Sequence, residues 1–215
     1  MLSDDFIIRM IRQATAVIKR IIGLKQAGDY QEALEEINHS LEPLLGMDIE
    51  IIKMMDDDSI YEILTQNDQI DLERLGFIAD LYKEEGDILL LQNQRQQSEN
   101  YYLSSLNYYL KIRINSESSS QKELSQKIEE IIQKLGRYNY PNKTLYDLFC
   151  YFENNEQYAK AENTITTLAA RPENNTNVKS ELLSFYKRLL ELEPKVLIAN
   201  GLSRKQLQNK LKELS

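Results

Sequence analysis

The strongest constraint on the fold is a two-residue break between two amphipathic stretches. Gly28 and Asp29 separate residues 4–27 from residues 30–45. In both stretches the apolar residues recur at steps of three and four, so each forms a helix with one apolar stripe. Gly28 tolerates the left-handed backbone that closes a helix. Because so short a break forces the helices to fold back on each other, the pattern predicts an antiparallel hairpin.

The spacing after this break occurs again near residue 158. The matching positions are Tyr30, Ala33 and Ile37 in the first case and Tyr158, Ala161 and Ile165 in the second. The small residue lies where the backbones of the two helices approach most closely. A weaker break with the same first two residues occurs at Gly86-Asp87.

The Gly-Asp-Tyr turn and the helix after it resemble the second half of a tetratricopeptide repeat. The first half fits less well, since the paired Leu-Gly positions of that family fall on Arg20 and Ile21. Residues 1–48 also resemble an uncharacterised bacterial family of tetratricopeptide-like proteins, through the Asp-Phe-Ile-x-Arg-Met-Ile start and the Gly-Asp-Tyr-x-Glu-Ala-Leu turn. The resemblance implies a fold and no activity.

We therefore predict an all-α fold, a right-handed array of antiparallel helical hairpins in a single domain over residues 1–215. With only 7 Gly and 4 Pro, a nearly all-helical chain is expected. Its parts are an N-terminal hairpin (1–46), a connector of short helices (47–67), a central hairpin (68–114) and C-terminal hairpins (121–215). The central hairpin is predicted to turn at Gly86-Asp87 into one long helix over 88–114. A lysine-rich helix beginning at Ser203 suits a terminal cap.

Charge and cysteine content limit the possible partners and compartments. The net charge is −8, with 9 Lys and Arg against 21 Asp and Glu in residues 1–100 and 17 against 13 in the rest. Without a basic patch, nucleic acid is not an expected partner. The asymmetry either lets two halves or two copies attract each other or reflects differently solvated faces. A single cysteine, no secretory signal and no membrane-spanning stretch predict a soluble cytoplasmic protein.

No residue pattern indicates a catalytic, cofactor or metal site, so we expect no enzyme. The acidic run 56–58 could bind a hard cation, but it lacks EF-hand spacing and is typical of solvated residues at a helix start. Cys150 with His39 as base is a conceivable nucleophilic pair. However, Cys150 lies between Phe149 and Tyr151 on an apolar helix, where a buried structural thiol is usual.

A group of tyrosines offers the best candidate for partner binding. The residues are Arg95, Tyr101, Tyr102, Tyr108 and Tyr109. The tyrosines recur seven apart, so they either fill a helix–helix seam or form an exposed peptide-binding stripe. The expected function is a protein–protein interaction module that holds a peptide or partner helix on a concave face. The alternative is a structural homodimer that self-associates through the helix 88–114.

Overall fold

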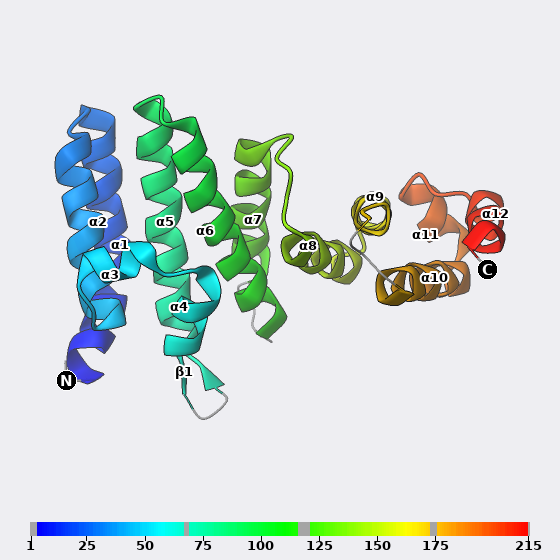
Figure 1. The fold of residues 1–215 in the computed structure, drawn as a ribbon, viewed down its shortest axis with the longest axis horizontal. Coiled ribbons are helices and arrows are strands. Elements are labelled where there is room, and N and C mark those ends of the chain that lie inside the picture. The colour runs from blue at the N-terminus through cyan, green and yellow to red at the C-terminus, as the bar shows by residue number, and fades with distance from the viewer. Residues whose placement is uncertain (1–3, 67–68, 116–120, 173–175, 215) are drawn as a thin grey trace. The chain divides into compact units, whose positions relative to one another are not determined.

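The computed structural model describes residues 4–66, 69–115, 121–172 and 176–214, and these residues form an all-α fold (Figure 1). This confirms the predicted fold class of helical hairpins. The chain divides into two compact units, Met1–Tyr138 and Asn139–Ser215. The predicted single domain over 1–215 stays a prediction.

The first unit holds two pairs of long helices and one further long helix, with short elements between the two pairs. Its helices are α1 (Asp4–Ala27), α2 (Tyr30–Leu45), α3 (Ile49–Met54), α4 (Asp57–Ile63), α5 (Leu72–Leu91), α6 (Arg95–Asn115) and α7 (Gln121–Leu135). The predicted connector contains α3 and α4, followed by a small antiparallel ladder of β1 (Thr65–Gln66) and β2 (Gln69–Ile70). Asp56 caps α4 by accepting a hydrogen bond from the amide of Ser59 at 2.8 Å.

The first hairpin matches its prediction. Gly28 has φ +86°, the left-handed conformation that glycine adopts without strain. The amide of Asp29 donates to the carbonyl of Leu24 at 3.0 Å, which closes α1. Ala33 is fully buried between the helices, as the hairpin prediction requires.

The predicted turn at Gly86-Asp87 and the helix 88–114 are wrong. Helix α5 continues through both residues to Leu91, and the chain turns at 92–94, where Asn93 has φ +61°. Gly86 serves a close approach instead of a turn. A Cβ atom there would lie 2.8 Å from the ring of Tyr102 on α6. The glycine therefore lets α5 and α6 pack along their length, and the helix proposed for dimerisation is absent as a single rod.

Helix α5 is the centre of the first unit. It packs against α6 and also contacts α1 and α2, while α6 contacts α7. Leu75, Ile78, Ala79 and Leu81 of α5 are fully buried. Figure 1 shows α5 between the first hairpin and α6. Because α5 contacts neighbours on several sides, few of its side chains face water.

The second unit contains the third predicted hairpin and three further helices. Its helices are α8 (Asn142–Asn154), α9 (Tyr158–Ala169), α10 (Thr176–Glu191), α11 (Pro194–Ala199) and α12 (Arg204–Leu214). Ala161 is fully buried, as predicted, and the rings of Phe149 and Phe185 meet edge to face at 5.2 Å. Helix α11 was not predicted from the sequence; it begins at Pro194, and a proline can open a helix as well as end one.

Candidate functional site

The predicted tyrosines divide into core and groove residues. Tyr102, Tyr108 and Tyr109 are 1–2% exposed and pack in the interior, so these three form a seam and not an exposed stripe. Tyr101 is half-buried and stacks edge to face on Tyr82 of α5 at 5.3 Å. Arg95 is exposed at the start of α6, where it pairs with Glu99 at 2.8 Å. A role for these residues in partner binding stays a prediction.

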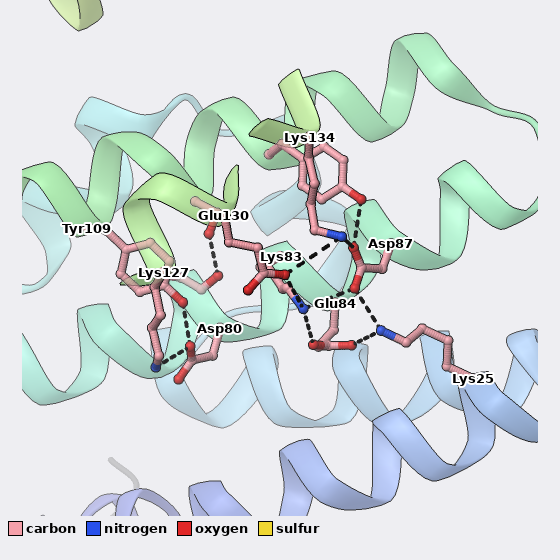
Figure 2. A network of polar contacts seen from close by, with 12 residues as sticks. Lys25, Asp80, Lys83, Glu84, Asp87, Tyr109, Lys127, Glu130 and Lys134 are labelled. Carbon is pink, nitrogen blue, oxygen red and sulfur yellow. Dashed lines mark hydrogen bonds and ion pairs between the residues drawn. The ribbon is translucent and has the colours of Figure 1, made fainter. Parts of the chain in front are cut away.

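One face of α5 carries a dense network of charged groups (Figure 2). Asp87 accepts hydrogen bonds from Lys25 of α1 at 2.7 Å, Lys134 of α7 at 2.8 Å and the hydroxyl of Tyr102 at 2.6 Å. Lys83, one turn earlier on α5, lies 3.0 Å from the same carboxylate. A single side chain of α5 thus links three other helices.

The partners of Asp87 fully compensate its burial. Burial alone would raise the pKa of this carboxyl, but the hydrogen bonds from Lys134, Lys25 and Tyr102 hold the pKa of Asp87 well below its ordinary value. Nearby, Asp80 accepts hydrogen bonds from Tyr109 and, at 2.7 Å, from Lys127. The hydroxyls of Tyr102 and Tyr109 are therefore part of a satisfied polar network, a role consistent with structure more than with ligand binding.

The opposite face of α5 forms the floor of a groove. Tyr82, Glu85 and Leu89 lie at steps of three and four, so they share one side of the helix, away from Asp87. One wall is a strip of α6 formed by Gln97, Asn100, Tyr101 and Ser104. The other wall consists of Leu34 of α2, Ile52 and Lys53 of α3, and Met55 and Asp57 after it. The groove has a volume of about 490 Å³.

Glu85 is the exceptional residue of this groove. It is 3% exposed, and its Oε1 atom lies 3.4 Å from Nζ of Lys53. The hydroxyl of Tyr101 also interacts with the carboxylate, but the buried Oε2 atom accepts no hydrogen bond from any described residue within ordinary geometry. Burial raises the pKa of Glu85 above its ordinary value, and Lys53 and Tyr101 offset this only in part.

Asp87 and Glu85 therefore differ sharply although they belong to the same helix. Asp87 accepts hydrogen bonds from three side chains and pairs with a fourth, whereas Glu85 has one ion pair at 3.4 Å, an interaction with the Tyr101 hydroxyl and an Oε2 atom without a hydrogen bond. Most buried polar atoms in folded proteins are hydrogen-bonded, so an exception requires an explanation. The sequence analysis missed Glu85. The available signal was its position on the apolar stripe between Tyr82 and Leu89, which becomes visible once α5 is continued through Gly86.

The other candidates from the sequence show no assembled site. Cys150 is half-buried in α8, and burial together with Asp147 and Glu153 raises the pKa of its thiol to about 11, so the thiol is protonated at neutral pH. His39 is exposed on α2 in the other unit. Within the described ranges, no group of three or more His, Cys, Asp or Glu side chains could hold a metal ion. Nor is any helix there both long and apolar enough to cross a bilayer.

The fold and the groove define an all-α protein built of helical hairpins with a polar cleft in its first unit. The chain belongs to DUF6483, a family of unknown function, which matches it over residues 1–215. No curated protein and no solved structure matches the chain.

Proposed function

We propose that this protein is a cytoplasmic protein–protein interaction module of tetratricopeptide-like type, without enzymatic activity. Its binding site is the groove of the first unit, between α6 on one side and α2 and α3 on the other. The ligand is a peptide segment or a helix of a partner protein.

The buried, under-satisfied carboxylate of Glu85 in the groove is the observation that carries this proposal. A groove with two aromatic side chains, two side-chain amides and three charged groups offers both apolar contact and orientation to a peptide. Gln97, Asn100 and Ser104 provide donors and acceptors along the wall, and Tyr101 provides a rigid amphipathic surface. Tyr101 was among the residues expected to bind a partner.

A peptide-library selection tests the proposal. Random peptides are selected on the full chain, and their affinities are measured by calorimetry on the wild type, on Asn100→Trp and on Gln96→Trp. Both positions are exposed on α6, but only Asn100 lines the groove. We expect micromolar binders that lose about tenfold or more in affinity, about 1.4 kcal/mol, on Asn100→Trp and remain unchanged on Gln96→Trp. No binders, or equal loss in both variants, would refute the proposal.

A further inference from the structure

We propose that the Glu85 carboxylate receives an arginine side chain of the partner peptide, which displaces Lys53 from it. This inference rests on the proposed function, since it names the chemistry of the ligand in the same groove. It assigns Glu85 as the specificity-determining residue of the groove.

The carboxylate of Glu85 is incompletely satisfied. A buried acceptor without a hydrogen bond destabilises the fold, because it has lost its contacts with water and gained none in return. The fold supplies hydrogen-bond donors to Asp87, two residues later, so the same helix shows what a saturated carboxylate looks like. At Glu85 it supplies one ammonium group at 3.4 Å and the hydroxyl of Tyr101, and Oε2 is left without a hydrogen bond.

The resident cation, Lys53, is partly exposed to solvent. The Lys53 side chain is 38% exposed, and α3 ends one residue later at Met54. A lysine at such a position can withdraw its ammonium group into water while its stem remains on the protein. Removing it from Glu85 breaks a single ion pair, because Lys53 forms no other ion pair within the described residues. The site can therefore exchange one cation for another.

The geometry of a carboxylate favours arginine over lysine as the ligand. A guanidinium group donates two parallel hydrogen bonds to the two oxygens of a carboxylate, whereas an ammonium group acts as a point charge. An arginine would satisfy the orphaned Oε2 and the weakly held Oε1 together. Its planar group can also stack on an aromatic ring, and the half-buried Tyr101 lines the groove beside the carboxylate.

The charge of the first unit favours the same ligand. Residues 1–138 carry 15 Lys and Arg against 25 Asp and Glu. Asp57 adds a second carboxylate to the groove lining, where Lys53 is the only basic residue. A cationic segment is thus attracted to this unit before contact, and an acidic segment is repelled.

The test is an NMR titration of the ¹⁵N-labelled full chain with N-acetyl-arginine amide, whose only charge is the guanidinium group. N-acetyl-citrulline amide, a neutral analogue of nearly the same shape, and N-acetyl-lysine amide are the matched controls. We expect saturable shifts at the amides of Ile52, Lys53, Glu85 and Tyr101 in the millimolar range. The lysine analogue should bind at least about fivefold more weakly, and the citrulline analogue should not bind.

Two variants decide whether Glu85 is responsible. Glu85→Gln keeps the shape and should lower the affinity for the arginine analogue at least about tenfold, with helix content unchanged by circular dichroism. Lys53→Met removes the competing cation and should raise the affinity. If Glu85→Gln fails to fold, the Lys53→Met result decides alone. An unchanged or lower affinity on Lys53→Met, shifts scattered over the acidic surface, or equal binding of citrulline would overturn the inference.

The outcome is separable from that of the proposed function. Selected peptides that depend on Asn100 but are insensitive to Glu85→Gln would leave the interaction module standing and refute the arginine site. Binding of the arginine analogue at Glu85 without any selected peptide would support a guanidinium site at Glu85 and refute the interaction module.

Discussion

Replacing Gly86 by alanine tests the close packing of α5 and α6. In the middle of a helix, this substitution normally stabilises by about 1 kcal/mol, because alanine loses less backbone entropy than glycine. Here the new Cβ atom would lie 2.8 Å from Cδ1 and Cε1 of Tyr102 and 3.3 Å from the carbonyl oxygen of Ser98. Ordinary carbon–carbon contacts lie at about 3.5–4.0 Å. The ring must therefore move by about 0.7 Å or more.

Tyr102 cannot make this movement freely. Its ring is 1% exposed, and its hydroxyl donates to Asp87 at 2.6 Å, which fixes the far end of the side chain. Overpacking of this kind costs about 1–3 kcal/mol, and a fixed ring favours the upper part of that range. After subtraction of the propensity gain, we expect Gly86→Ala to lower the free energy of unfolding by about 1–2 kcal/mol.

The assay is urea unfolding followed by circular dichroism, with a control on the same helix. At Gly76 a new Cβ atom would have its nearest described contact at 3.7 Å, from Ile112, so Gly76→Ala should stabilise by up to about 1 kcal/mol. In a background of Tyr102→Leu, where the ring is gone, Gly86→Ala should lose most of its destabilising effect. Equal stabilisation by Gly86→Ala and Gly76→Ala would refute the close-approach explanation.

Three further outcomes are expected in the same unfolding assay. Asp87→Asn should destabilise the protein by about 2–4 kcal/mol, because it leaves partly buried lysines without their shared carboxylate. Since the pKa of Asp87 is lowered in the fold, this carboxylate stabilises the protein above the unfolded pKa, near 4, and the stabilisation should disappear as the pH falls below that value. Leucine at Ala33 or at Ala161 should destabilise by about 1–3 kcal/mol, and an unchanged midpoint would contradict the tight helix crossing there. Because the pKa of Glu85 is raised in the fold, the wild type should lose stability as the pH increases from about 4.5 through that pKa. Glu85→Gln should abolish this loss, and a variant with the pH profile of the wild type would argue against a strained carboxylate.

Local patterns predicted the hairpins well where one physical cause determines the structure. Gly28 adopts the left-handed conformation that closes a helix, and Ala33 follows at the spacing of a tight crossing. Gly86 was misread because a glycine inside a helical pattern has two uses, a turn or a close approach, and only the neighbouring helix decides between them. In the same way, Pro194 can end one helix or begin the next at its first position.

The candidate site could be predicted only in part. Tyr101 was found because aromatic side chains at helical spacing are visible in the sequence. Glu85 was not found, since its significance depends on Lys53, which belongs to a different helix, and on the donors that the fold does not supply. Whether all oxygens of a buried carboxylate accept hydrogen bonds depends on tertiary packing, and the neighbouring sequence carries little sign of it.

The carboxylate of Asp87, which several helices share, affects how such a chain can change its length over evolution. Arrays of hairpins ordinarily grow and shrink by gaining or losing whole repeats, because each repeat contacts only its immediate neighbours. In the first unit, one carboxylate is shared by cations from α1 and α7 as well as α5. Deleting or duplicating a hairpin would leave charged side chains without their partners in the remaining helices. In this unit the gain or loss of a hairpin therefore carries an electrostatic cost that a simple repeat array does not have.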